Sequence, residues 1–256
     1  VLFGAGALIG TYDVTQTKHS LLRNYPLQAH LRYFAEGVRP ELMQYFVEKD
    51  TDGRPYDRNH RSIVYQRSKG VLDEKPFGTQ LDVYKEEYEW LTHSIAPKPK
   101  STEQFRTTIG GGGCKHPYSA SLLNVSAMSF GAISANAIMS LNRGAKLGNF
   151  YHDTGEGGCS KYHRKEGGDL VWEIGSGYFG CRNDDGSFNE DKFRDTAQID
   201  NIKMVEIKVS QGAKAGHGGV LPGPKVSKEI AEARGVPEGV DCISPAFHTA
   251  FSSPKG

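Results

Sequence analysis

The chain has 256 residues, with 31 Lys and Arg side chains against 30 Asp and Glu, and its formal net charge is +1. Both halves of the chain are balanced in charge, which argues against a nucleic-acid-binding protein, because such proteins attract phosphates with clustered basic side chains. With 37% hydrophobic and 24% charged residues, the chain can bury a core, which excludes a wholly disordered protein.

The chain opens on an apolar run, Val1 to Gly10, that is shorter than the roughly 20 residues needed to span a bilayer. Two interpretations of this run stay open. It is either the end of a membrane helix that begins upstream or an ordinary buried helix. The first interpretation predicts a protein tethered to the inner face of a membrane.

Residues 1–100 are expected to form a helical, aromatic-rich region. From Leu27 to Ala35, apolar side chains recur at spacings of three and four residues, which is typical of an amphipathic helix. Gly37 is expected to end this helix and Pro40 to begin a second one. Aromatic side chains at this spacing usually pack in a core, so we assign this region to packing.

The composition changes after the linker at 95–101, which contains two prolines, and the density of glycine roughly doubles beyond it. We therefore place a domain boundary near residue 100, with a second domain at 101–256. Short apolar runs there alternate with amphipathic stretches. Four strands are predicted, each followed by a loop of small or polar residues, at 122–128, 149–152, 204–209 and 240–243.

Two helices are predicted between these strands. Ser134 is expected to cap a helix that Gly148 closes, and Gly223 with Pro224 is expected to open another that ends at Gly235. The stretch at 160–201 is long for a connection and is expected to form an insertion. The pattern predicts an α/β fold with a parallel sheet and functional loops at the carboxyl ends of its strands.

Four cysteines are spaced too widely for a zinc or iron–sulfur ligand set, or for a dense disulfide framework. They are Cys114, Cys159, Cys181 and Cys242. Free buried thiols are the expectation for all four, and no metal site is predicted. This cysteine usage favours a reducing compartment such as the cytoplasm.

Two loops carry residues that suggest chemistry. In Thr154–Gly158, glycines flank Glu156, so that backbone N–H groups could cradle an anion, although a simple tight turn explains the pattern equally well. In 207–219, Lys208 lies inside an apolar strand, where an unpaired ammonium is costly. Either an anionic ligand or a structural carboxylate must therefore lie near Lys208.

These loops also carry a resemblance to a known family. The chain resembles the FMN-binding synthase domain of glutamate synthases through segments that occur in the family's order. They are SAMSFGAIS at 126–134, TGEGG at 154–158, IKVSQGAKAGHGG at 207–219, LPGPKV at 221–226 and the Ile243–Ser244–Pro245 strand end. The first region resembles the shorter, membrane-tethered members of the family through HSLLRNYP at 19–26, YQRSKG at 65–70 and PFGTQ at 76–80.

The resemblance implies a TIM-type (β/α)8 barrel, of which about the first four strands would lie in this chain. It implies that FMN lies across the carboxyl ends of the strands. It also implies that a hydride passes to 2-iminoglutarate, which is formed from 2-oxoglutarate and ammonia, to give glutamate. The phosphate-binding loops and any iron–sulfur cluster are expected downstream of Gly256, so the 256-residue chain alone is expected to hold FMN weakly and to be inactive.

By resemblance, three segments carry the site residues, and all follow strands at the same end of the sheet, so we expect them to share one concavity. The cofactor-binding positions are Ala127, Met128, Ser129, Thr154, Gly155, Lys208 and Gln211. Glu156, Lys214 and Arg234 match positions around 2-oxoglutarate, and Glu156 and Lys214 are the catalytic candidates. Two cations suit a dicarboxylate substrate.

Three departures from the family pattern bear on function. Val220 stands where the family has a substrate-binding glutamine, and His248 is the one histidine where the family has two. The chain begins with Val1 and not with the nucleophilic cysteine of an amidotransferase, so ammonia, free or glutamine-derived, is expected from elsewhere. A non-catalytic scaffold and an FMN oxidoreductase of a different substrate remain as alternatives, and the motifs do not identify the electron donor.

Overall fold

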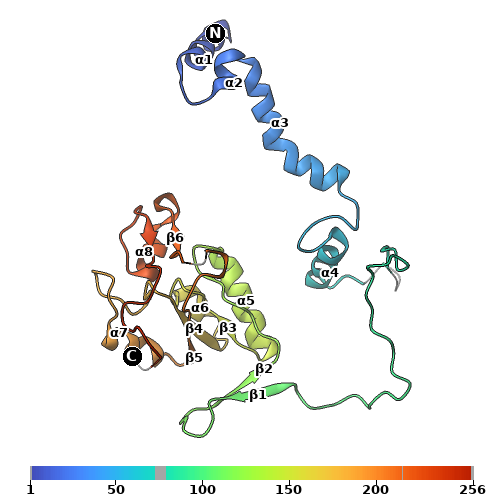
Figure 1. Ribbon diagram of the computed structural model, residues 1–256, viewed down its shortest axis with the longest axis vertical. Coiled ribbons are helices and arrows are strands. Elements are labelled where there is room, and N and C mark those ends of the chain that lie inside the picture. The colour runs from blue at the N-terminus through green and yellow to red at the C-terminus, as the bar shows by residue number, and fades with distance from the viewer. Residues whose placement is uncertain (1, 73–78, 215, 255–256) are drawn as a thin grey trace. The chain divides into compact units, whose positions relative to one another are not determined.

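The computed structural model describes residues 2–72, 79–214 and 216–254 and divides into two compact units, Val1–Pro97 and Lys98–Gly256 (Figure 1). The division falls within the linker at 95–101. The first three residues of the PFGTQ motif, and Ala215 in the 207–219 motif, lie outside the described residues.

The regular secondary structure of the first unit is helical in the part of it that the structure describes. Its elements are α1 (Leu2–Thr15), α2 (Ser20–Asn24), α3 (Gln28–Leu42), the π-helical turn η1 (Met43–Val47) and α4 (Arg58–Lys69). The Asp57 side chain caps α4 by accepting a hydrogen bond from the His60 amide at 2.8 Å. Gly70 ends α4 in the left-handed conformation, the usual way for a helix to stop.

The two short helices predicted around Gly37 and Pro40 form one helix, because α3 runs through both residues to Leu42. A glycine inside a helix is unfavourable by only about 1 kcal/mol, which the hydrogen bonds of the neighbouring helical residues outweigh. Proline has a backbone φ that suits a helix but lacks an N–H group. The irregular turn η1 follows directly, and there the helix widens before it ends at Glu48.

Helix α1 is not the ordinary buried helix of our second interpretation, because most of its apolar side chains are exposed. Phe3 is 97% and Leu8 is 75% exposed. The buried residue of α1 is Asp13, whose carboxylate accepts a hydrogen bond from the Leu27 amide and lies 2.9 Å from His30 Nε2. Among the described residues, no helix combines the length and apolar character that a bilayer crossing requires.

The second unit is a mixed α/β structure with a parallel sheet, as predicted. Its sheet has the strand order β3 (His152–Asp153), β4 (Leu170–Ile174) and β5 (Ile202–Ile207). Its helices are α5 (Ala135–Gly148), α6 (Lys161–Lys165), α7 (Glu190–Ala197) and α8 (Lys228–Arg234), with short 3-10 turns η2 (Gly212–Lys214) and η3 (Gly223–Lys225). Closure into an eight-stranded barrel stays a prediction.

Two antiparallel strand pairs lie outside the parallel sheet. They are β1 (Arg106–Ile109) with β2 (Tyr118–Ser121), and β6 (Val220–Leu221) with β7 (Cys242–Ile243). The strand predicted at 240–243 is therefore not a fourth parallel strand. The strand predicted at 122–128 is reduced to a single bridge between Val125 and His152, and Leu122 and Leu123 are exposed.

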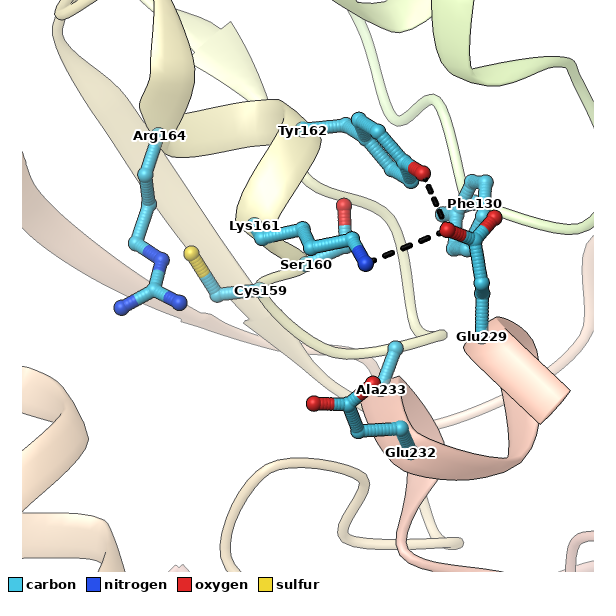
Figure 2. A pocket seen from close by; sticks show the side chains of 9 residues that line it. All are labelled: Phe130, Cys159, Ser160, Lys161, Tyr162, Arg164, Glu229, Glu232 and Ala233. Carbon is cyan, nitrogen blue, oxygen red and sulfur yellow. Dashed lines mark hydrogen bonds and ion pairs between the residues drawn. The ribbon is translucent and has the colours of Figure 1, made fainter.

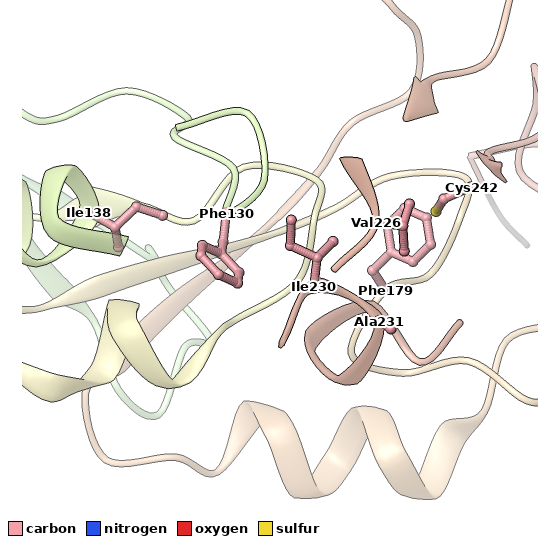
Figure 3. Packing of buried hydrophobic residues seen from close by; sticks show 7 residues of the cluster. All are labelled: Phe130, Ile138, Phe179, Val226, Ile230, Ala231 and Cys242. Atoms are coloured by element: carbon pink, nitrogen blue, oxygen red, sulfur yellow. The ribbon is translucent and has the colours of Figure 1, made fainter. Parts of the chain in front are cut away.

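The stretch at 160–201, which we expected to form an insertion, contains β4, the middle strand of the sheet. Leu170, Trp172 and Ile174 of β4 point to one side and pack with Tyr178, Cys181 and Ile202 in a buried cluster. A second cluster joins α5 to α8 and consists of Phe130, Ile138, Phe179, Val226, Ile230, Ala231 and Cys242 (Figure 3). The buried clusters thus fix the sheet on the side that faces the helices. Because side chains alternate along a strand, Val171 and Glu173 of β4 face the opposite side, the inner face.

The local features of α5 follow the sequence closely. The Ser134 hydroxyl accepts a hydrogen bond from the Ala137 amide, as predicted for a helix cap. Gly148 is the last residue of the helix, and Asn149 takes the left-handed conformation that ends it. The four thiols are free, but Cys114 is exposed and only Cys181 and Cys242 are fully buried.

Candidate functional site

A change of register between β4 and β5 decides which side chains face the site. Leu170 pairs with Ile202, but Val171 pairs with Met204, so Lys203 is an extra residue in β5. Because side chains alternate along a strand, an extra residue moves all later side chains to the opposite face. Ile202 therefore packs in the core, whereas Lys208 faces the same side as Glu173.

Three segments meet at Lys208. Its ammonium Nζ lies 3.4 Å from Oε2 of Glu156 and 3.8 Å from Oε1 of Glu173. Gln211 Nε2 donates a hydrogen bond to the same Glu156 oxygen at 2.5 Å. The structure thus brings Glu156, Lys208 and Gln211 together, and it supplies the carboxylate partners that the sequence required for a lysine in an apolar strand.

The 126–134 and 154–158 loops pack closely against each other. Gly155 has a φ of +67°, and a Cβ atom there would lie 2.7 Å from the Ser129 amide nitrogen. The Gly155 amide donates to Asp153 Oδ1 at 2.8 Å, and the Met128 amide donates to the Asp153 carbonyl at 3.1 Å. The buried Thr154 hydroxyl accepts a hydrogen bond from the Glu173 amide. Met128, Ser129, Thr154 and Gly155 therefore form one rigid edge beside Glu173, while Ala127 is exposed.

Arg234 and Lys214 differ in their surroundings. Arg234 is 7% exposed, and its guanidinium donates to the Ser129 hydroxyl and lies over the Phe179 ring. In this arrangement Arg234 supports the loop that carries Ser129, and direct contact with a substrate stays a prediction. Lys214 is exposed in η2. Within the part of the chain that the structure describes, its ammonium forms no ion pair.

His248, the one histidine of the 244–249 segment, fixes the backbone of Lys208. Its Nε2 donates to the Lys208 carbonyl at 2.8 Å. The Tyr178 hydroxyl accepts hydrogen bonds from the amides of Thr249 and Ala250, so it donates its own hydrogen to His248 Nδ1 at 3.2 Å. This chain of hydrogen bonds holds the end of β5 in place.

Glu173 is a site residue that sequence reasoning missed. It is 4% exposed, and burial, followed by the neighbouring charge of Asp153, raises its pKa to about 7. Burial also raises the pKa of Asp153 to about 6. The signal was present in Leu170–Ile174, an apolar run that contains one acid, just as the run around Lys208 contains one cation. The carboxylate oxygens of Asp153, Glu173 and Glu206 lie within 4.8 Å of one another.

A pair of buried histidines lies on the helical side of the sheet. His163 Nδ1 faces the Ser160 amide, which can only donate, so Nε2 carries the hydrogen and donates to the Met128 carbonyl at 2.9 Å. The His152 ring lies 5.4 Å from that of His163, and neither of its nitrogens has a hydrogen-bond partner among the described residues. Burial, and then His163, lowers the pKa of His152 to about 4.

Replacing His152 with Leu is expected to reduce the loss of stability in acid. Below its ordinary pKa of 6.5, His152 gains a proton in the unfolded chain but stays neutral in the folded one until about pH 4. Stability is therefore lost as the pH falls through this window. Between about pH 7.5 and about pH 5, this contribution amounts to about 2 kcal/mol.

Urea unfolding of both proteins at the two pH values measures this difference. Asp153 and Glu173 have raised pKa values and change stability in the opposite direction, but they are common to both proteins and cancel. His116→Leu, at an exposed position, is the matched control and should keep the wild-type pH dependence. Equal acid sensitivity of His152→Leu and the wild type would show that His152 is not responsible.

The pocket in Figure 2 lies between α6 and α8 and is separate from the residues around Lys208. Its volume is about 170 Å³. Lys161 and the Tyr162 hydroxyl both contact the Glu229 carboxylate, at 3.1 and 2.5 Å, so these charges are already paired. Burial raises the pKa of the Cys159 thiol to about 12, which removes it as a nucleophile. This pocket carries no chemistry that we can assign.

Comparison with known proteins gives a consistent assignment. The model of the family described as "Conserved region in glutamate synthase" matches residues 98–256. The chain is 32% identical over 283 aligned residues to the glutamate synthase large subunit-like protein YerD of Bacillus subtilis, covering 94% of this chain and 54% of that protein. It is also 42% identical over 122 residues to the archaeal-type glutamate synthase [NADPH] of Thermotoga sp. (strain RQ2), covering 48% of this chain and 22% of that protein.

The archaeal glutamate synthase [NADPH] of Archaeoglobus fulgidus is 42% identical over 121 residues, which cover 47% of this chain and 21% of that protein. The chain thus spans about half the length of YerD and about a fifth of the archaeal-type enzymes. The family match covers the unit that contains the parallel sheet and the Lys208 cluster, and the similarity to YerD extends over the first unit as well. The chain therefore belongs to the glutamate synthase family.

Proposed function

We propose that the protein is an FMN-dependent oxidoreductase that reduces 2-iminoglutarate, formed from 2-oxoglutarate and ammonia, to glutamate. The observation that carries this proposal is the meeting of Glu156, Lys208 and Gln211 at the carboxyl end of the parallel sheet in a chain of this family. These residues come from two motifs separated by about fifty positions, and their common location is what a shared ligand requires.

The residues around Lys208 fit a flavin ring. A Cβ atom at Gly219 would lie 2.8 Å from Glu156 Oε1, so the loop backbone approaches the cluster where no side chain could. Lys208 Nζ and the buried Glu173 Oε1 offer polar groups toward the same space. A flavin ring combines hydrogen-bond acceptors with a face that packs on apolar atoms, and this donor set matches that chemistry.

Each proposed site residue has a role that its surroundings allow. Lys208 would place a fixed cation at the flavin edge that becomes negative on reduction, since ion pairs and the His248 hydrogen bond hold it in position. The remaining ring contacts are assigned to Ala127, Met128, Ser129, Thr154, Gly155 and Gln211. When bound, FMN supplies the hydride transfer.

The substrate is assigned to Glu156 and Lys214. The exposed ammonium of Lys214 suits a carboxylate group of a 2-oxo or 2-imino acid. Arg234 is proposed to act through Ser129, whose hydroxyl it contacts at 3.3 Å. The Val220 side chain, at an exposed position of β6, offers no hydrogen bond to the substrate. Glu156 and Lys214 must therefore recognise the substrate without it. Ammonia is proposed to come from solution or from a glutamine-hydrolysing partner.

The larger assembly is proposed to include a (β/α)8 barrel that contains β3, β4 and β5, with the FMN phosphate held on loops outside this chain. A membrane tether near the first unit is supported by the exposed apolar surface of α1, which includes Phe3, Leu8 and Ile9. A cytoplasmic active site is the matching location. A barrel interior would cover Glu173 and Asp153, which are already buried on the inner face.

The test is to purify the full-length protein, record its flavin spectrum, and assay glutamate formation from 2-oxoglutarate and ammonium with chemically reduced FMN. Bound FMN together with glutamate formation would support the proposal. Bound FMN that reduces other 2-imino acids but not 2-iminoglutarate would change the substrate and keep the cofactor. A protein that binds no FMN would overturn the proposal in favour of a non-catalytic scaffold.

A further inference from the structure

Carboxyl groups outnumber the one ammonium group, that of Lys208, in the cluster on the inner face of the sheet. Asp153 of β3, Glu173 of β4 and Glu206 of β5 have carboxylate oxygens within 4.8 Å of one another. Lys208, which directly follows β5, lies near Glu173 and near Glu156 in the loop after β3. Carboxylates this close together in a partly buried cluster are unfavourable, since like charges at short distance raise one another's proton affinity. A proton on one of the buried carboxyl groups relieves this repulsion, and the hydrogen bonds favour one position for it.

The other three carboxyl groups have contacts or exposure to solvent that Glu173 lacks. Asp153 accepts the Gly155 amide at 2.8 Å, and Glu156 accepts Gln211 and faces Lys208 at 3.4 Å. Glu206 is exposed and can be hydrated. Each of these carboxylates has a donor or water to stabilise its negative charge.

Glu173 lacks these partners. Its buried Oε1 accepts no hydrogen bond from the described residues, and its contact with Lys208 Nζ is the longer of the two, at 3.8 Å. A buried carboxyl group in such surroundings usually takes up a proton and becomes neutral. The raised pKa of Glu173 agrees with this arrangement.

We propose that Glu173 is a further residue of the cofactor site and that it holds a proton, with which it donates a hydrogen bond to an acceptor atom of the flavin ring bound against Lys208. The inference rests on the proposed function for the identity of the ligand. Glu173 then complements Lys208, because a neutral donor and a cation together stabilise negative charge on the ring without a further charge in the pocket. Glutamine keeps the shape and a donor at this position, whereas alanine keeps neither.

The experiment uses the full-length protein freed of flavin, with the variants Glu173→Gln and Glu173→Ala. Infrared difference spectra between the wild type and Glu173→Gln at about pH 6 should show the carbonyl band of a protonated carboxylic acid, and the band should fade as the pH rises through about 7. The absence of this band would overturn the protonated state of Glu173. This measurement needs no ligand, so it stands apart from the proposed function.

Titration with FMN, followed by flavin fluorescence, tests the hydrogen bond. Binding by the wild type should weaken more than about tenfold between about pH 7 and about pH 9, because binding requires the proton that Glu173 loses. Glu173→Gln should bind with less than about threefold change over this range, and Glu173→Ala should bind more weakly at both pH values. Glu232→Gln, on the exposed face of α8, should keep the wild-type pH profile.

Two outcomes would contradict the inference in different ways. If wild-type FMN affinity is independent of pH and Glu173→Gln behaves the same, the hydrogen bond from Glu173 to the flavin is wrong, although FMN binding stands. If the wild type binds no FMN at all, the proposed function and the ligand assignment both fail, and the infrared band alone decides whether Glu173 holds the proton.

Discussion

Replacing Lys208 with Met is expected to lower glutamate formation by the full-length protein at least about a hundredfold, as is typical when one preorganised group that stabilises developing charge is removed. Methionine keeps much of the side-chain length but removes the ammonium that lies 3.4 Å from Glu156 and 3.8 Å from Glu173. The flavin reduction potential should become more negative, since the cation that favours the reduced, anionic ring is lost.

The measurement pairs steady-state rates with a redox titration of the bound flavin. Lys228→Met, at an exposed position at the start of α8, is the matched control and should leave both quantities unchanged. The Glu173 carboxyl must also respond, because it loses the neighbouring cation that lowers its pKa, and its pKa should rise further. An unchanged rate and potential in Lys208→Met would remove Lys208 from the cofactor site.

Replacing Trp172 with Ala is expected to destabilise the second unit by about 3–5 kcal/mol, the typical range for deleting a buried Trp side chain. Trp172 is fully buried on the helical side of β4 and stacks on Phe193 of α7 at 5.6 Å. Its indole nitrogen has no hydrogen-bond partner among the described residues, so the loss comes from packing alone. Such a loss is a large part of the stability of an ordinary domain.

Urea unfolding followed by far-UV circular dichroism measures this loss. Trp90→Ala is the matched control, because Trp90 is 69% exposed and its removal should change the unfolding free energy by less than about 0.5 kcal/mol. Similar unfolding curves for Trp172→Ala and the wild type would show that β4 does not pack in the core of this unit. The position of β4 at the centre of the sheet would then need revision.

Local patterns in the sequence predicted the parts of the fold that local forces decide. Ser134 and the apolar spacing of α5 specify a capped helix without reference to the rest of the chain. The α/β character of the second unit followed from the alternation of strands and helices. The continuity of α3 through Gly37 and Pro40 could not be inferred, because glycine costs a helix interior about 1 kcal/mol and proline about 3 kcal/mol, and such residues usually mark the end of a helix.

The middle strand of the sheet escaped prediction because β4 is five residues long and carries a charged residue, Glu173, among its apolar ones. A short apolar run interrupted by a charge cannot be told from a segment of buried helix by its periodicity alone. The sequence motifs placed Glu156, Lys208 and Gln211 at the same end of the sheet. They could not show that Lys203 is an extra residue in β5, which is what turns Lys208 toward Glu173.

The burial of Arg234 was equally hidden, since nothing in its sequence neighbourhood indicates that the guanidinium packs over Phe179. A helix terminus with a basic residue is usually exposed, and here the 126–134 loop covers it through Ser129. Contacts between residues about a hundred positions apart decide such details, and they depend on the whole fold. The sequence therefore identifies the participants in the candidate site better than it identifies their orientation.

A crystal structure of the full-length protein with FMN tests the central claim most directly, because that claim concerns where the flavin lies. We predict that the flavin ring lies against Lys208 and Gln211, with the Ser129 loop along one side and Glu173 within hydrogen-bond distance of a ring acceptor. Flavin bound elsewhere, for instance between α6 and α8 in the pocket of Figure 2, would contradict the account even if the protein makes glutamate.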